Sequence, residues 1–136
     1  MSQQIATTTQ QTLKDVRRAL LHLHKTLLDM ERAAYEQARG RVSSGELLQL
    51  VINHEQFAWL RSLSALIVRI DEMLDAEEPV TDDEAKSLLA EARALLKPAE
   101  TGNNFERKYF AALQREPAAV IAHREVVQSL TDQKLN

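Results

Sequence analysis

The spacing of the apolar residues constrains this fold more than any other feature of the sequence. From Leu13 to Leu27 the apolar positions alternate in steps of three and four, and they then continue to Met30 and Ala34. That spacing places them on one face of an α-helix, whereas a half-buried strand would alternate at every second residue. Only three Gly and three Pro occur in 136 residues, which leaves little material for hairpin turns. The chain is therefore predicted to be all-α.

Capping signals divide the first half of the chain into two long helical stretches. Thr8 or Thr9 can cap the first stretch, and Gly40 ends it. The second stretch opens at Ser43, three residues before a glutamate that completes a capping box, and continues to about Ala76. We expect these two stretches to form a helical hairpin.

The second half of the chain contains a short helical stretch and a longer one. Thr81 opens the short stretch with a capping box, and Pro98 ends it. The longer stretch begins at Asn103 or Asn104 and is predicted to be kinked or divided at Pro117, because proline lacks a backbone N–H. Its apolar face is expected to carry Phe105, Tyr109, Leu113, Val120, Val127 and Leu130.

Short connections between long helices favour antiparallel neighbours, so the fold class predicted is an up-down four-helix bundle. We expect one domain over residues 1–136, with a flexible arm at 1–8 and a frayed end at 132–136. The third stretch is roughly half as long as the others, so it should cover only part of its neighbours. Some apolar surface on the second stretch should therefore stay bare.

The second stretch is apolar on two sides. Its main stripe is expected to face the core and consists of Leu48, Ile52, Trp59, Leu63, Leu66, Ile70 and Met73. The other side is the predicted interface and consists of Leu47, Leu50, Phe57 and Val68. A helix that is apolar on two sides in a partly covered bundle indicates a homodimer, or a groove for a helix of another protein.

Polar residues occur at positions where the helical pattern predicts the interior, and burying them without partners would cost several kcal/mol. The predicted constellation consists of Arg17, His24, Glu31, Glu55, Gln56, Tyr109, Glu116 and His123. Aligning the first two stretches about a turn near residue 42 suggests layered pairs. We expect Arg17 to pair with Glu116 and His24 with Tyr109, while Glu31 pairs with Gln56 or with a partner chain.

A metal centre is the alternative interpretation of the same residues, with His24, Glu31, Glu55 and His123 as its candidate ligands. On the first stretch, His24 and Glu31 are seven residues apart, which corresponds to about 10.5 Å along a helix. That separation is too large for both side chains to bind one ion. The chain also lacks the Glu-x-x-His pairs of ferritin-like bundles and the His-x-x-x-Glu run of hemerythrin-like ones. We therefore predict no metal and no cofactor.

Composition makes several classes of function unexpected. The chain has no Cys, so thiol chemistry is not expected. Its net charge of −3 offers no general basic face, so a nucleic-acid partner is not expected either. Short basic clusters at 14–18 and 107–108 leave nucleic-acid binding as a third interpretation. The longest apolar run, 62–68, is bounded by arginines and too short to span a membrane. Nucleophilic catalysis by serine is also not expected, because no serine lies in the strand-turn-helix setting that such enzymes use.

The function predicted from the sequence is therefore association and not catalysis. We expect a cytoplasmic, non-enzymatic helical bundle that forms a homodimer or serves as an adaptor for a helical protein partner. The alternative is a bundle that binds a metal or a small ligand through its interior polar residues.

Overall fold

The computed structural model describes the backbone of residues 2–78 and 80–132, and the side chains of residues 8–78 and 80–131. Every regular element in these ranges is a helix, so the all-α prediction is confirmed. The described ranges hold seven helices where the sequence analysis expected four. They are α1 (Ser2–Arg39), α2 (Ser44–Asn53), α3 (Glu55–Ala58), α4 (Arg61–Leu74), α5 (Asp82–Leu95), α6 (Asn104–Arg115) and α7 (Pro117–Asp132).

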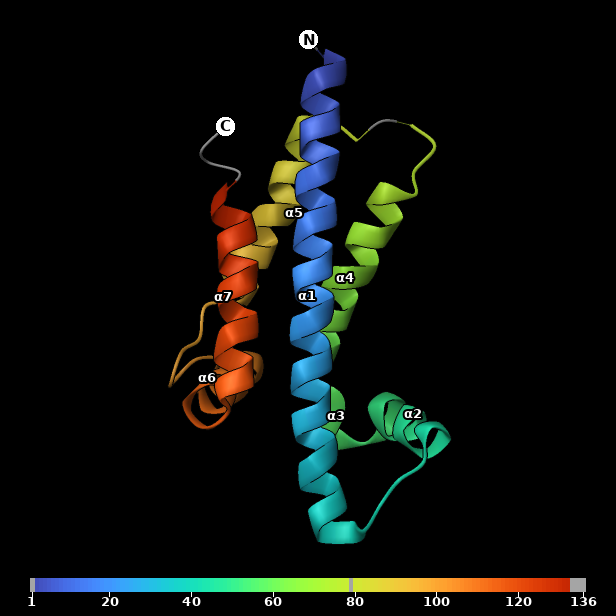
Figure 1. Cartoon of the computed structure of the whole chain (residues 1–136), viewed down its shortest axis with the longest axis vertical. Coiled ribbons are helices and arrows are strands. Elements are labelled where there is room, and N and C mark those ends of the chain that lie inside the picture. The colour runs from blue at the N-terminus through green and yellow to red at the C-terminus, as the bar shows by residue number, and fades with distance from the viewer. Residues whose placement is uncertain (1, 79, 133–136) are drawn as a thin grey trace.

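Helix α1 is the centre of the fold. It runs nearly the whole length of the molecule, and it packs against α7, α4, α5 and α3 (Figure 1). The longer helices α1, α4, α5 and α7 alternate in direction along the chain. Helix α2 stands apart at the lower right of the view, and its main contacts are with the short helix α3.

The first helix begins earlier than its capping signal predicts. It starts at Ser2, so the backbone of residues 2–8 is helical where the sequence analysis expected an arm. Neither Gly nor Pro occurs in this segment, so nothing in it breaks a helix. At the other end α7 continues to Asp132, and the remainder of the predicted frayed end lies outside the described residues.

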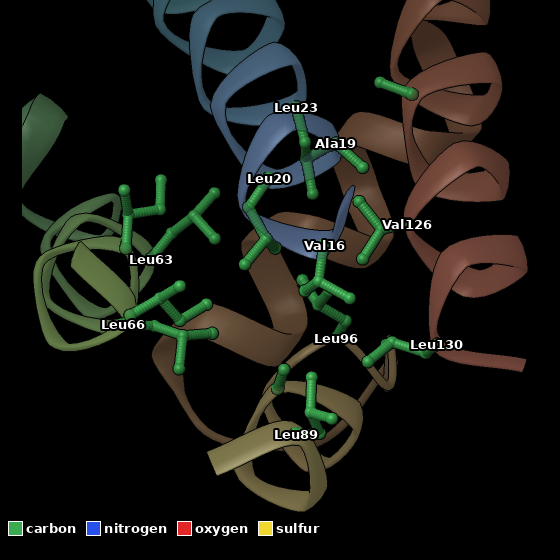
Figure 2. Packing of buried hydrophobic residues seen from close by; sticks show 14 of the residues in the cluster. Val16, Ala19, Leu20, Leu23, Leu63, Leu66, Leu89, Leu96, Val126 and Leu130 are labelled. Carbon is green, nitrogen blue, oxygen red and sulfur yellow. The ribbon is translucent and has the colours of Figure 1, made fainter. Parts of the chain in front are cut away.

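One hydrophobic core joins the long helices. The predicted stripe of α1 is confirmed from Leu13 to Leu27, since Leu13, Val16, Leu20, Leu23 and Leu27 are all fully buried, but Met30 is only half-buried and Ala34 is exposed. Figure 2 shows side chains of α1 converging with those of the helices around it. The labelled partners are Leu63 and Leu66 of α4, Leu89 of α5, Leu96 beyond its end, and Val126 and Leu130 of α7.

Helix α5 follows the prediction for the short third stretch in part, because only the Thr81 side-chain half of the predicted capping box is present. The Thr81 side chain caps it by accepting a hydrogen bond from the backbone N–H of Glu84 at 3.1 Å. Its inward face buries Ala85, Leu88, Leu89 and Ala92. Thr9 Oγ1 donates to Asp82 at 3.0 Å, which ties the start of α5 to α1.

Pro117 divides the fourth stretch into α6 and α7. The expected common face is wrong for α7 at Val120 and Val127, which are exposed, and is confirmed there only at Leu130, which is buried. The other inward residues of α7 are Ala119, Ala122 and Val126. The non-helical backbone at Glu116 interrupts the helical phase, so a stripe read continuously across it is rotated out of place in α7.

Candidate interaction surface

Helix α2 is the apolar element that the core does not absorb. Half of its ten residues are aliphatic, yet none of the ten is buried. Leu48 is 58% exposed and Ile52 is 54% exposed, so the expectation that they belong to the core stripe is wrong. Further along that stripe, Trp59, Leu63, Leu66 and Ile70 are buried as predicted.

A break at His54 explains why the two parts of the stripe separate. The backbone of His54 is extended, with φ −88° and ψ 136°, so it ends α2 and caps α3. Its N–H donates to the carbonyl of Leu50 at 2.8 Å, and its Nδ1 accepts from the N–H of Gln56 at 3.1 Å. A non-helical residue resets the helical phase, so the apolar face of α2 does not continue into α4.

The structure separates the four residues predicted as an interface. Phe57 is fully buried, so its assignment to an exposed surface is wrong. Val68 is 53% exposed, on α4. Leu47 and Leu50 are half-buried on α2. In α2 the exposed side is therefore that of Leu48 and Ile52, which was predicted to face the core. The side of Leu47 and Leu50, which was predicted to be the interface, is the less exposed one.

Phe57 belongs to an aromatic cluster at the base of α2. Its ring centroid lies 6.2 Å from that of Tyr35 and 6.2 Å from that of His54. Tyr35 and His54 meet edge to face at 5.5 Å. The guanidinium of Arg39 lies 5.7 Å from the centroid of Tyr35. This packing connects the end of α1 with the residue at which α2 ends.

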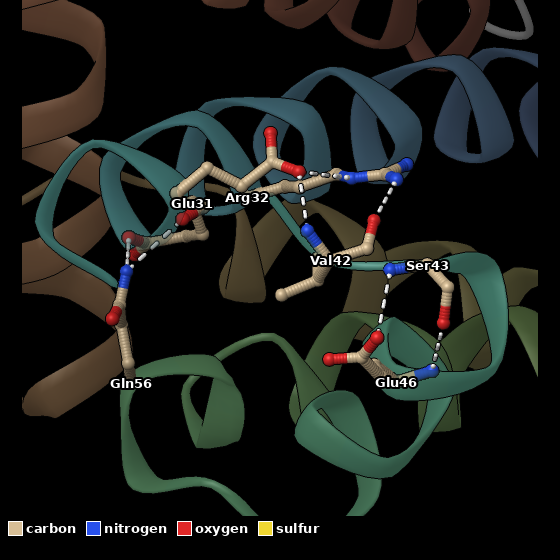
Figure 3. A network of polar contacts seen from close by, with 7 residues as sticks. Glu31, Arg32, Val42, Ser43, Glu46 and Gln56 are labelled. Carbon is tan, nitrogen blue, oxygen red and sulfur yellow. Dashed lines mark hydrogen bonds and ion pairs between the residues drawn. The ribbon is translucent and has the colours of Figure 1, made fainter. Parts of the chain in front are cut away.

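Hydrogen bonds fix the segment that leads into α2. Gly40 has φ +91°, a left-handed conformation that favours glycine and ends α1. Arg32 Nη2 donates to the carbonyl of Val42 at 2.8 Å, and the N–H of Val42 donates to Glu36 at 2.9 Å. Figure 3 shows the contact of Arg32 with Val42, beside the start of α2.

Both ends of α2 itself are also fixed. At its start the predicted capping box is present: Glu46 N–H donates to Ser43 Oγ at 3.2 Å, and Ser43 N–H donates to Glu46 Oε1 at 3.4 Å (Figure 3). At its end Arg61 Nη2 donates to the carbonyl of Ile52 at 2.5 Å. Helix α2 therefore projects with Leu48 and Ile52 uncovered, while hydrogen bonds fix both of its ends.

Glu31 is the buried charged residue at the junction of α1 with α3. Trp59 Nε1 donates to its Oε2 at 2.6 Å, and Gln56 Nε2 donates to its Oε1 at 3.1 Å and to its backbone carbonyl at 3.0 Å. The predicted contact between Glu31 and Gln56 is therefore present (Figure 3). The hydrogen bond of Trp59 was not predicted from the sequence, where Trp59 was expected only to pack in the core.

Arg17 and His24 have partners other than those predicted. Arg17 pairs with Asp71 and not with Glu116, while His24 Nε2 is hydrogen-bonded to Ser64 Oγ at 2.8 Å and not to Tyr109. A turn near residue 42 would place residue 67 opposite Arg17 and residue 60 opposite His24. Both observed partners lie four residues further along the chain. Because α2 leaves the line of the hairpin, more chain is used before α4 returns along α1, and the register shifts by about one turn.

Tyr109 instead pairs with His123 across the division at Pro117. The Tyr109 hydroxyl and His123 Nδ1 lie 2.6 Å apart. Burial raises the pKa of the Tyr109 phenol above its ordinary value and lowers the pKa of His123. The phenol therefore keeps its proton, and its hydroxyl is hydrogen-bonded to a neutral imidazole. Burial also lowers the pKa of His24.

The structure does not gather the alternative metal ligands. Glu55 is exposed on α3, contrary to its expected place in the interior, while His24 and Glu31 are engaged as described. Glu116 is half-buried, and its backbone ends α6. In the part of the chain that the structure describes, no three His, Asp or Glu side chains are grouped so that they could hold a metal ion. Each buried side-chain nitrogen or oxygen there has a hydrogen-bond partner.

Comparisons with known proteins add no relative: no protein-family model, curated protein or solved structure matches this chain. Among the helices described, none combines the length and the apolar content that crossing a bilayer requires.

Proposed function

We propose that this chain is a non-enzymatic helical-bundle protein that acts by association, and that α2 carries its binding surface. The observation on which the proposal depends is that half of the α2 residues are aliphatic and none is buried. Removing apolar surface from water stabilises a protein by about 25 cal/mol for each Å² that is buried. Association would recover that free energy.

The anchoring of α2 supports the same proposal. A binding helix gains affinity when its conformation is fixed in advance, because less conformational entropy is lost on binding. Arg32 holds the backbone just before α2, Arg61 holds its last turn, and the capping box of Ser43 with Glu46 fixes its first turn. We propose a second copy of this chain as the partner, which makes the protein a homodimer. A helix of another protein is the other candidate partner.

The test is the oligomeric state of the protein as a function of concentration. A ten-residue helix is about 15 Å long, so its interface is at the small end of specific interfaces and the dimer should be weak. Sedimentation from about 10 µM to about 1 mM covers the range expected for such an affinity. We expect a dimer that dissociates on dilution, and a double variant with Leu48→Asp and Ile52→Asp that stays monomeric.

Ile121→Asp is the matched control. Ile121 on α7 is 58% exposed, close to the 54% of Ile52, but it lies on another helix. It should leave the dimer intact, and circular dichroism should show that all three proteins are folded. A wild-type protein that stays monomeric at every concentration would overturn self-association. Equal loss in both variants would place the interface outside α2.

A further inference from the structure

A cleft of about 610 Å³ lies beside the last turns of α1, at the end of the molecule where α1 continues past α6 (Figure 1). That volume is within the roughly 300–1,000 Å³ typical of sites that hold small molecules. Its wall on α1 is formed by Met30, Ala33, Ala34 and Gln37, which share one side of the helix. Met30 and Ala34 continue the stripe of α1 beyond the buried Leu27, so the end of that stripe lines a cleft and not the core.

Two arginines from distant parts of the chain line the same cleft. Arg41 directly follows Gly40, the residue that ends α1, and Arg115 lies in the last turn of α6. Neither arginine forms an ion pair with a described carboxylate. Arg115 Nη2 contacts Met30 Sδ at 4.0 Å, but a thioether is only a weak acceptor. Both guanidinium groups therefore retain N–H donors that a ligand can use.

The cleft carries excess positive charge even though Glu36 also lines it. Glu36 accepts a hydrogen bond from the N–H of Val42 at 2.9 Å, and its Oε2 lies 3.6 Å from Nε of Arg32. Its charge is therefore paired with that of Arg32, which leaves Arg41 and Arg115 without a counter-ion among the described residues. The contacts of Val42 with Glu36 and Arg32 also hold the backbone next to Arg41.

We propose that this cleft binds a small organic oxyanion, in which a phosphate or carboxylate group is joined to an apolar body, and that Arg41 and Arg115 hold the charged group. The two guanidinium groups repel each other, and a bound oxyanion adds an attraction to both. Arginine can donate two parallel N–H bonds to either kind of oxyanion. The apolar body packs on Met30, Ala33 and Ala34, where the short alanine side chains leave room for it. None of these residues belongs to α2, so the site is additional to the proposed association surface.

Phenyl phosphate and phenylacetate are suitable probes, because they carry the two kinds of charged group on the same apolar ring. Titration of the ¹⁵N-labelled protein followed by NMR should shift the amide signals of residues 30–41 and of Arg115. The Kd should be on the order of 1 mM, as two charge-assisted contacts at an open site allow. The probe with the lower Kd identifies the charged group. Inorganic phosphate lacks the apolar body and should bind at least about threefold more weakly than phenyl phosphate.

A pair of charge-neutralising variants tests the assignment of the arginines. Arg41→Gln with Arg115→Gln should weaken binding at least about tenfold, with circular dichroism showing that the fold is unchanged. Arg107→Gln with Arg124→Gln is the matched control, because it removes two exposed arginines from α6 and α7 that do not line the cleft. It should change the Kd less than about twofold, since exposed charges outside a site are screened by salt.

Three results would overturn the proposal, and none of them depends on whether α2 self-associates. The first is the absence of a saturable shift at the cleft with either probe up to about 20 mM. The second is equal weakening in the two pairs of variants, which would indicate attraction to net charge and not to a site. The third is equal affinity for inorganic phosphate and phenyl phosphate, which would leave an adventitious ion only.

Discussion

Replacing Glu31 with alanine should destabilise the fold more than the loss of any exposed carboxylate. The variant removes the acceptor of the Trp59 indole N–H, and Trp59 is only 3% exposed, so that donor would be left without a partner. A stranded buried donor costs about 1–3 kcal/mol, and a bond to a charged acceptor contributes about 1.5–3 kcal/mol. Gln56 retains the backbone carbonyl of Glu31, and relief of carboxylate burial offsets part of the loss. We therefore expect a loss of about 3 kcal/mol in the free energy of unfolding.

Urea denaturation followed by circular dichroism measures this loss, and it should correspond to a fall in Tm of roughly 10 °C. Glu55→Ala is the control, because Glu55 is exposed, and it should stay within about 0.5 kcal/mol of wild type. A double-mutant cycle of Glu31→Ala with Trp59→Phe should give a coupling of about 1–2 kcal/mol. A loss below about 1 kcal/mol for Glu31→Ala, or a coupling near zero, would refute the assignment.

Three further changes test other parts of the fold. Phe57→Ala should lower the free energy of unfolding by about 3–5 kcal/mol in urea titrations, because Phe57 is fully buried, whereas a mere interface residue would cost little in the monomer. Gly40→Ala should cost about 1–2 kcal/mol in the same assay through its positive φ alone, since the space around it is open, and an unchanged midpoint would contradict this. Burial lowers the folded-state pKa of His24 and His123 below the ordinary value of 6.5, so the unfolded chain binds protons first as the pH falls. Stability should therefore be greatest above pH 6.5 and decline below it by at most about 1.4 kcal/mol per pH unit for each histidine, with a flatter decline in His24→Gln.

The parts of the fold that follow from local pattern could be predicted from the sequence. The stripe of α1, the cap of α5 at Thr81 and the division at Pro117 depend on spacing, capping chemistry or a missing N–H, all of which act over a few residues. The break at His54 has no such signal, because neither Gly nor Pro marks it. The break is held by the cap that His54 Nδ1 makes with the Gln56 N–H, and by the ring contacts of His54 with Tyr35 and Phe57, of which the contact with Tyr35 forms only once the chain has folded.

The errors at the candidate surface follow from that one break. Because the second stretch was taken as continuous, Ile52 was assigned to the core and Phe57 to the surface, and the structure reverses both. The same detour shifts the level at which α4 faces α1, which brings Asp71 to Arg17 and Ser64 to His24, both on α4 and not on the fourth stretch where their partners were predicted. The contact between Glu31 and Gln56 was still predicted, because Gln56 lies only three residues beyond the level that a turn near residue 42 assigns to Glu31.

The extensive packing of α1 against α7 has a consequence for how the chain reaches its native state. These helices are the first and the last in the described chain, so their contacts join residues that are far apart in sequence. A growing polypeptide that has reached only residue 116 would leave the side of α1 around Ala19 without the Val126 layer that covers it. We expect such intermediates to bind chaperones and to fold only when the final segment emerges, since closing long loops slows folding.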